Sequence, residues 1–261
     1  MSGGPTVLVE RQGAIAQVTL NRPERRNGVT VAMCFAFHEA VSRIAGSDAR
    51  VLVLRGAGDD FCVGADIAAS PEENAPPTEP GTATPGDMGA IYHASTLLHT
   101  MPQVTIAAID GGCAGAGMGW ATACDLRFAT ARARFSTAFL NVGVSGDMGL
   151  AWNLARLVGG AKARELLFFP DRFDGRDALA VGLVNRLYEP DVLHARTRAL
   201  AEQLAARDPL ALRLMKANCV SAETLPMGDY IEVESGRHLQ TTNRPELRRL
   251  MAEGYAHRKG S

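Results

Sequence analysis

The chain has 261 residues, of which 46% are hydrophobic and 21% are charged, an ordinary composition for a globular protein. Its formal net charge of -1 provides no overall positive field for nucleic acid, and no apolar run reaches the roughly 18 residues needed to span a membrane. We therefore expect an α/β protein with a sizeable core and with no nucleic-acid or membrane partner.

The five cysteines are scattered, odd in number and without CxxC or finger-like Cys/His spacing. This pattern favours reduced thiols over a disulfide framework or a zinc site. The first residues, Met1 to Pro5, lack the basic and apolar regions of a signal peptide. We expect a cytoplasmic protein that binds no metal.

The N-terminal part predicts strands that alternate with helices. Two β-rich runs, Val7–Arg11 and Ala14–Leu20, flank a Gln-Gly pair and predict a hairpin. Apolar residues at helical spacing follow Thr30, which we expect to cap a helix through Ile44. Val51–Leu54 is a continuous apolar run, typical of a strand buried on both faces.

A proline-rich stretch from Ser70 to Gly89 interrupts this pattern. Its five prolines, set among Glu, Thr and Gly, predict a long loop or lid rather than core. Beyond it, Ile91–Met101 predicts a helix and Val104–Ile109 a second buried strand.

The rest of the chain predicts short elements and then a helical end. Leu183–Leu187 predicts a small strand, and the chain from Asp191 onward is mostly helical. The alternation indicates parallel βαβ units. We expect residues 1–190 to form a core domain and residues 191–261 a helical oligomerisation region that packs on it or on another subunit. The remaining predicted elements are the strands Asp125–Ala129 and Ala133–Phe135 and the helices Met118–Cys124, Leu150–Val158, Ala161–Phe168, Arg176–Val181, Val192–Ala206 and Leu210–Val220.

Two stretches, Phe61–Ile67 and Asp110–Gly119, each follow a predicted strand with small residues that open a turn. Small residues let the backbone approach a ligand closely. A helix begins near Gly117, so backbone N–H groups there are unpaired, and two such groups aimed at one oxygen make an oxyanion hole. Close packing of a helix on a sheet is the alternative explanation. A dinucleotide loop fits poorly, because the glycine spacing is not GxGxxG and no acidic residue lies at the required distance.

The same two stretches, together with Leu20 to Asn27, resemble signature segments of the crotonase (enoyl-CoA hydratase/isomerase) superfamily. Further segments match in order and spacing, so the resemblance spans nearly the whole chain. It implies a crotonase-like spiral of ββα units with a helical C-terminal region, assembled as a homotrimer or hexamer. It also implies that the protein binds an acyl-CoA thioester and polarises its carbonyl, with coenzyme A as part of the substrate rather than a cofactor. The further matching segments are Phe135 to Gly149, Ala155 to Gly159, Ala178–Val184 and Pro209–Lys216.

By this resemblance the oxyanion hole lies at the backbone N–H groups of Ala65 and Ala116. Family members receive the adenine along the segment that begins at Val63, and basic residues approach the phosphates where Arg25 and Arg26 stand here. Solvated surface charge is the alternative for both arginines. A neighbouring subunit is expected to contribute a C-terminal aromatic residue or lysine. The residues we expect to contact the acyl-CoA are Arg25, Arg26, Val63, Gly64, Asp66, Ile67, Gly115, Gly117, Phe139, Tyr255 and Lys259.

The acid and base residues depart from the hydratase pattern. Typical hydratases of the family place two glutamates around the substrate, at positions that correspond here to Gly119 and Phe139. Asp147 instead resembles the aspartate of family members that use a single carboxylate, namely double-bond isomerases and aromatic-CoA dehalogenases. One carboxylate suffices for isomerisation, because it can take a proton from one carbon and return it two carbons away. A dry pocket would raise the pKa of Asp147 toward that role, whereas capping of the following helix is the alternative.

A dehalogenase would use Asp147 as a nucleophile, assisted by a tryptophan at the position of Phe139 and a histidine near Tyr92 or His93. Phe139 has no N–H group, which disfavours this chemistry. We expect His93 to be structural or solvated and Trp152 to pack in the core.

Three functions stay open on the sequence alone. The favoured one is an enoyl-CoA isomerase that uses Asp147 and the oxyanion hole. The others are an enoyl-CoA hydratase with altered acid and base residues, and a non-catalytic acyl-CoA binder.

Overall fold

The computed structural model describes residues 4–74, 85–245, 247 and 249. The chain forms two compact units, Met1–Ala205 and Ala206–Ser261, which are described separately. Among the described residues, no helix is both long and apolar enough to cross a bilayer.

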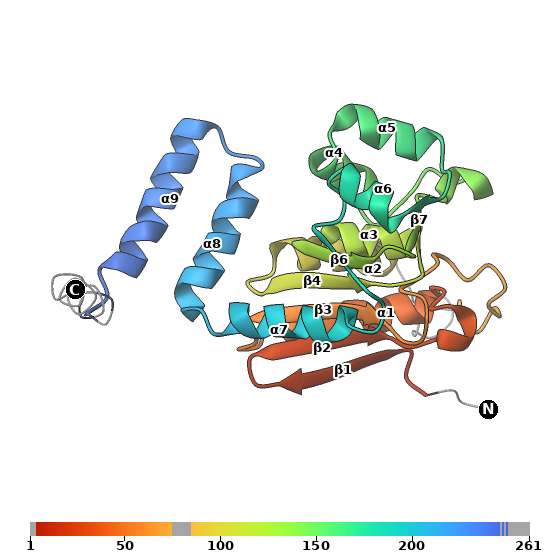
Figure 1. The fold of residues 1–261 in the computed structure, drawn as a ribbon, viewed down its shortest axis with the longest axis horizontal. Coiled ribbons are helices and arrows are strands. Elements are labelled where there is room, and N and C mark those ends of the chain that lie inside the picture. The colour runs from red at the N-terminus through yellow and green to blue at the C-terminus, as the bar shows by residue number, and fades with distance from the viewer. Residues whose placement is uncertain (1–3, 75–84, 246, 248, 250–261) are drawn as a thin grey trace. The chain divides into compact units, whose positions relative to one another are not determined.

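The first unit is built on a six-stranded sheet with the order β1-β2-β3-β4-β6-β9 (Figure 1). β1 and β2 form the expected antiparallel hairpin, and Gly13 takes the positive φ of +57° that its tight turn requires. All later neighbours pair in parallel, as the alternation of strands and helices predicts. The strands are β1 Val7–Gln12, β2 Ile15–Leu20, β3 Val51–Gly56, β4 Val104–Ile109, β6 Leu126–Thr130 and β9 Arg186–Tyr188.

A smaller sheet has the order β5-β7-β8, formed by Gly112–Ala114, Arg134–Ser136 and Phe173–Asp174. β5 pairs with β7 in parallel, and β8 closes this sheet in the antiparallel sense. Its first strand lies inside the glycine-rich stretch, so the predicted turn there begins with an ordered strand.

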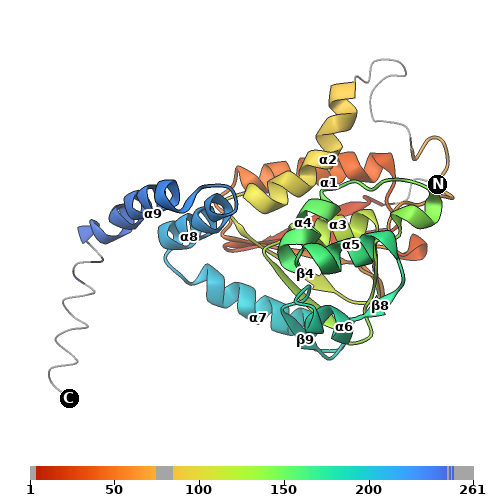
Figure 2. The same ribbon diagram turned by 90° about the horizontal axis from the view of Figure 1, so that it is seen from above.

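The large sheet is buried on both faces, which explains its continuous apolar strands. In β3, Leu52 and Leu54 belong to one core, whereas Val51 and Val53 belong to a second core on the opposite face. Figure 2 shows α1 and α2 on one side of the sheet and α7 on the other. The helices of this unit are α1 Val31–Ala45, α2 Pro85–Thr100, α3 Ala116–Ala123, α4 Leu150–Leu157, α5 Gly160–Phe168, α6 Gly175–Ala180 and α7 Leu193–Ala205, with short 3-10 turns η1 Pro23–Arg25 and η2 Phe139–Val142.

The bounds of most predicted elements agree with the structure to within two residues. Two other elements, α2 and β9, differ by more. The predicted cap is confirmed, because the Thr30 hydroxyl accepts a hydrogen bond from the backbone N–H of Met33. The helix α2 begins at Pro85, inside the predicted loop, since proline is tolerated in the first turn of a helix. The strand predicted at Leu183–Leu187 begins later in the structure, as β9 at Arg186–Tyr188. Leu183 cannot join the strand because its N–H bonds to the carbonyl of Ala178 in α6.

The second unit contains a helix pair, α8 Pro209–Ala222 and α9 Met227–Thr242. Asp208 caps α8 by accepting from the N–H of Ala211 at 2.8 Å, and Pro209 occupies the first turn. The side chain of Arg237 joins the two helices through the Asn218 amide at 2.9 Å and a nearby serine hydroxyl. The division between units falls after Ala205 rather than at residue 190, because α7 packs on the large sheet.

Candidate active site

The two small-residue stretches lie side by side, as their shared pattern predicts. Cys62 donates its N–H to the carbonyl of Gly112 at 2.9 Å, and Ala114 donates to the carbonyl of Cys62 at the same distance. Gly64 has a φ of +91°, and a Cβ at this position would lie 3.2 Å from the carbonyl oxygen of Ala114. Glycine is therefore needed both for the backbone conformation and for the close approach of the two chains.

Two backbone donors at this junction are unpaired. Within the part of the chain that the structure describes, neither the N–H of Ala65 nor that of Ala116 donates a hydrogen bond. Ala116 is the first residue of α3, where helix N–H groups have no intrahelical acceptor. A Cβ on Gly117 would lie 2.5 Å from the carbonyl oxygen of Cys62, so this glycine allows α3 to start against the first stretch. Two backbone N–H groups without acceptors can together bind a negatively charged oxygen.

The position of the first missing glutamate is closed by packing. Gly119 is buried in α3, and a Cβ there would lie 2.5 Å from the Cβ of Met148. Met148 is 4% exposed and has a positive φ of 52°, an uncommon conformation for a residue with a side chain. The loop that carries Asp147 therefore fills the space in which a hydratase-like glutamate would need to sit.

Asp147 is half-buried and has no ion partner among the described residues. Its Oδ1 is buried without a hydrogen-bond partner in the same part of the chain, and burial raises the pKa of this carboxyl above its ordinary value of 3.8. The alternative role as a helix cap is wrong for the side chain, because Gly149 is the N-cap of α4 and no side chain bonds there. An unpartnered, partly dehydrated carboxylate is suited to accept a proton from carbon.

Cys34 of α1 is electrostatically linked to both Asp147 and the first small-residue stretch. The thiol of Cys34, in that helix, has its pKa raised to about 12, first by burial and then by the nearby charges of Cys62 and Asp147. Phe139, at the position of the second missing glutamate, connects the same parts. A Cβ on Gly115 would lie 3.9 Å from its ring, and one on Gly146 would lie 3.4 Å from it. The Phe139 ring thus lies between Gly115, which precedes α3, and Gly146, which precedes Asp147.

The two predicted phosphate-binding arginines are engaged by carboxylates of this chain. Arg25 makes bonds of 2.6 and 3.0 Å to Asp66, and Arg26 makes bonds of 2.7 and 3.1 Å to Asp60. Arg22, which is buried, also binds Asp66 at 3.0 Å. The Arg25 and Arg22 guanidinium groups hold the pKa of Asp66 down at about 2, against the effect of burial. Asp66 therefore acts here as an anchor for arginine side chains.

Arg26 stays 63% exposed in spite of its ion pair. Together with Val63 it lines a cavity of about 290 Å³ that also contains Arg134 and Arg172. This cluster of guanidinium groups keeps the phosphate-binding prediction open for Arg26.

Other predicted residues lie away from this convergence or outside the described part. Ile67 is 88% exposed, and His93 is an exposed residue of α2 whose Nδ1 lies 3.2 Å from the hydroxyl of Thr96. Tyr255 and Lys259 lie outside the described residues. The prediction that Trp152 packs in the core is wrong. Its indole is 41% exposed, because it stacks with a surface arginine of the same helix instead.

Sequence reasoning missed the supporting residues of this site. Met148 is a bulky residue in a glycine-rich segment, which could have drawn attention to it. No sequence motif, however, indicates its contact with Gly119. The backbone carbonyl of Cys62 accepts the bond that joins the two stretches. Arg22 is part of the N-terminal signature segment, yet only the fold shows that it reaches Asp66, 44 residues away.

Comparison with known proteins agrees with this geometry. The family model described as enoyl-CoA hydratase/isomerase matches residues 10–259. The short-chain-enoyl-CoA hydratase of Clostridium acetobutylicum is 30% identical over 80% of this chain and 79% of its own. The mitochondrial Delta(3,5)-Delta(2,4)-dienoyl-CoA isomerase of Rattus norvegicus is 31% identical over 82% of this chain and 68% of its own.

A solved structure from Thermobifida fusca, described as a candidate enoyl-CoA hydratase in complex with CoA, is similar at 27% identity and a TM-score of 0.82. The match covers 91% of this chain and 93% of that chain. Agreement of the family model, the curated relatives and the fold establishes the crotonase architecture that the signature segments imply. The chain belongs to the enoyl-CoA hydratase/isomerase family.

Proposed function

We propose that this protein is an enoyl-CoA double-bond isomerase in which Asp147 moves the proton and the N–H groups of Ala65 and Ala116 bind the thioester oxygen. The observation that carries the proposal is the half-buried carboxylate of Asp147, which, unlike those of Asp60 and Asp66, has no arginine partner among the described residues. Asp147 has an unpartnered Oδ1 and a raised pKa, whereas the two positions of the hydratase glutamates are Gly119 and Phe139.

The proposed reaction needs one base and no water. Asp147 takes a proton from the carbon next to the carbonyl of a 3-enoyl thioester, and the C–H electron pair moves toward the carbonyl. The resulting dienolate places negative charge on the thioester oxygen, which the two free N–H groups stabilise. Asp147 then returns the proton two carbons further along, and the double bond shifts into conjugation with the carbonyl.

Packing around the site supports this choice over hydration. Hydration by the usual route needs two carboxylates to position and activate one water. At Gly119 the contact with Met148 leaves no room for a glutamate, and Phe139 presents an apolar ring. The hydratase relatives favour the second candidate, an enoyl-CoA hydratase that works with Asp147 alone.

We further propose that acyl-CoA binds along Val63 to Ile67 with phosphates near Arg26, and that the chain assembles as a homotrimer or hexamer. A cavity with three arginines at Arg26 supports the phosphate assignment. Exposed apolar residues on both units support the assembly, since Phe168, Phe169 and Met227 are 63%, 68% and 73% exposed.

The test is a mass-spectrometric turnover assay on 3-enoyl, 2-enoyl and aromatic CoA thioesters, run with the wild type and Asp147→Asn. We expect conversion of 3-enoyl to 2-enoyl thioester without a mass gain of water. Asp147→Asn should lower the rate by at least about 100-fold, the lower range for loss of a general base, while binding of the thioester persists. Asp171→Asn, an exposed carboxylate of the same type, serves as the control and should retain activity.

Each outcome of the assay separates the candidates. Water addition to the 2-enoyl thioester would replace the isomerase by the hydratase. Binding without turnover of any thioester would indicate an acyl-CoA binder. Full activity of Asp147→Asn would remove Asp147 from the mechanism whichever reaction is seen.

A further inference from the structure

A second cavity lies on the face of the large sheet that α7 covers, away from the candidate active site. Its volume is about 440 Å³. Ile15 and Val53, which line it, belong to the core under α7, whereas Cys62, Ala116 and Met148 belong to the core on the other face. The two sites therefore share no lining residue and are separated by the sheet.

The strand register explains why this face becomes polar at the cavity. Val51 and Val53 point toward α7, and alternation along the strand sends Arg55 to the same face. On the neighbouring strand Gln17 pairs with Val53 and directs its side chain to this side as well. Glu10 pairs with Gln17 across the hairpin, so three adjacent strands change from apolar to polar together.

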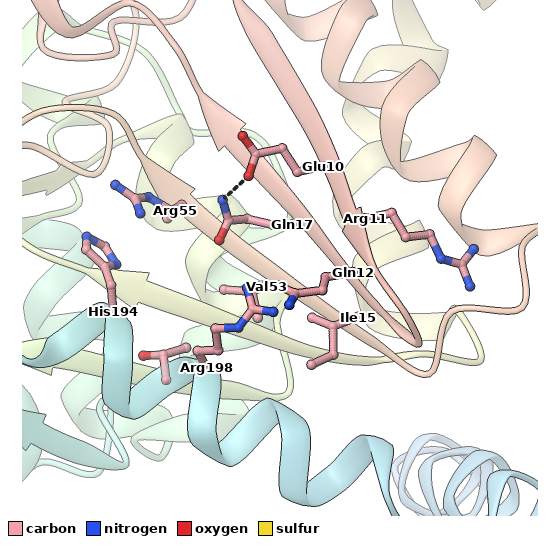
Figure 3. Close-up of a pocket in the computed structure, with 10 residues that line it drawn as sticks. Glu10, Arg11, Gln12, Ile15, Gln17, Val53, Arg55, His194 and Arg198 are labelled. Carbon is pink, nitrogen blue, oxygen red and sulfur yellow. Dashed lines mark hydrogen bonds between the residues drawn. The ribbon is translucent and has the colours of Figure 1, made fainter.

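The helix α7 supplies the opposite wall. His194, Thr197 and Arg198 are spaced three and four residues apart and so share one face of the helix. In Figure 3, His194 and Arg198 from α7 lie around the same space as Arg55 and Gln17 from the sheet.

The charge of the cavity is unbalanced. Among the described residues no carboxylate lies within 4.0 Å of the Arg55 guanidinium, and its one hydrogen bond is a long contact of 3.3 Å to the carbonyl of Gly56. Burial lowers the pKa of Arg55, which reflects the cost of a charge with little compensation. Within the described ranges, Arg198 pairs only with Glu202 on its own helix. Glu10 is the single acidic residue of the lining, and it accepts a bond from Gln17 at 3.2 Å.

Two further polar groups of α7, Thr197 and His194, line the same cavity. Thr197 is 1% exposed, and its hydroxyl has no hydrogen-bond partner within the described part of the chain. The pKa of His194 is lowered, first by burial and then by the Arg55 charge, against a smaller opposite effect of Asp110. Buried polar groups in native proteins are normally satisfied, so the Thr197 hydroxyl indicates a missing acceptor.

We propose that this cavity binds a small organic anion through a phosphate or carboxylate group held between Arg55 of β3 and the His194, Thr197 and Arg198 face of α7. An oxyanion supplies charge to the two arginines and an acceptor to the histidine. The space beyond the charged group, next to Ile15 and Val53, accommodates an apolar part of the ligand. The site is independent of the proposed isomerase reaction, because it lies across the sheet from Asp147.

The test uses the full chain with inorganic pyrophosphate and citrate as separate probes, titrated by calorimetry at low salt. The two probes distinguish a preference for phosphate from one for carboxylate. Arg55→Gln should weaken binding by at least about tenfold, since hydrogen bonds to charged groups are the strong ones. Thr197→Val, which keeps the shape of the side chain, should weaken binding by a few-fold. Arg11→Gln is the matched control, because Arg11 borders the cavity but points away from it and pairs with Asp48 at 2.6 Å.

A second measurement locates the bound anion. The His194 imidazole, assigned by comparison with His194→Gln, should titrate at higher pH when the probe is bound, because an anion favours the protonated ring. Arg55 opposes that protonation in the free protein and Asp110 favours it, and Arg198 and Glu10 also line the cavity.

Three results would each overturn the proposal. They are no detectable binding of either probe, equal weakening by Arg11→Gln and Arg55→Gln, or an unchanged His194 titration at saturating probe. Displacement of the probe by stoichiometric CoA would also contradict it, because the anion would then occupy the acyl-CoA site.

Discussion

At the scale of single residues, Asp147 combines its proposed role as a base with a cost to stability. Its folded pKa is raised by burial, so between the ordinary value and the raised one the unfolded chain loses the proton first. Stability therefore falls as pH rises through that window, and the full cost is present at neutral pH. The same pKa shift would set the lower pH limit of the proposed reaction, because a base must be ionised to accept a proton.

We predict that Asp147→Asn raises the melting temperature at pH 7 while it removes turnover. The gain should shrink as the pH falls and should vanish below the ordinary pKa, where both states of the wild type are protonated. Thermal unfolding of both proteins between pH 3 and pH 8 measures this. A variant that is less stable than the wild type at pH 7 would show that the carboxylate has a stabilising partner.

The pKa of Asp66 is shifted in the opposite direction from that of Asp147, because arginines stabilise the charged form of Asp66. Its folded pKa is about 2, below the ordinary value of 3.8, so its contribution is present above pH 4 and is lost as the pH falls toward 2. Asp66→Asn leaves Arg22, whose side chain is only 7% exposed, without one acceptor. We expect a loss of about 1–3 kcal/mol at pH 7, measured by urea unfolding. A difference from the wild type that persists at pH 2 would contradict the ion-pair explanation.

At the scale of elements, the start of α3 is the part that the proposed chemistry depends on most. Ala116→Pro removes one N–H at a helix position where proline is tolerated. We expect a loss of about 100- to 1,000-fold in kcat, the usual effect of removing one oxyanion donor.

Ala116→Gly is the matched control, because it removes the methyl group but keeps the N–H, and it should retain most activity. Steady-state kinetics on the best thioester of the panel compares the two variants. Equal losses in both would assign the effect to packing rather than to the donor.

The contact between α3 and the Asp147 loop explains why a glutamate is absent here. Gly119→Ala places a Cβ about where the Met148 side chain begins, and we expect a loss of about 1–3 kcal/mol from overpacking. Activity should fall as well, because Met148 adjoins Asp147. Gly236→Ala in α9, where a Cβ meets nothing within 4 Å, is the control and should be neutral or stabilising. Unchanged stability of Gly119→Ala would show that the loop is free to move.

The elements also show what a sequence alone can predict. Periodicity and capping predicted α1 and its Thr30 cap, because both are local properties. Prolines predicted a loop through Gly89, but α2 uses Pro85 at its start, where the missing N–H costs nothing. The free donors of Ala65 and Ala116 followed from family motifs. The arginine–carboxylate pairs and the packing of Gly119 on Met148 join segments far apart in the chain, and no local pattern encodes them.

At the scale of the whole molecule, the cavity under α7 is the feature that the amino-acid sequence offers least reason to expect. Three strands and one helix contribute its lining, and none of them carries a recognisable motif. Its polar character follows from alternation along β3, which becomes visible only when the register with β2 is known. The candidate active site, in contrast, could be proposed from the sequence because two short stretches, which the fold places side by side, carry most of it.

The proposed assembly would explain the exposed apolar surface. Phe168 and Phe169 end α5 with 63% and 68% of their area exposed, an unusual cost for a soluble surface. If a second copy covers them, the double variant Phe168→Glu, Phe169→Glu should dissociate the oligomer, because two buried charges without partners cost several kcal/mol. Sedimentation velocity should then show a monomer. A wild type that sediments as a monomer would refute the trimer, and an oligomer that survives the double variant would move the interface elsewhere, toward the exposed residues of α9.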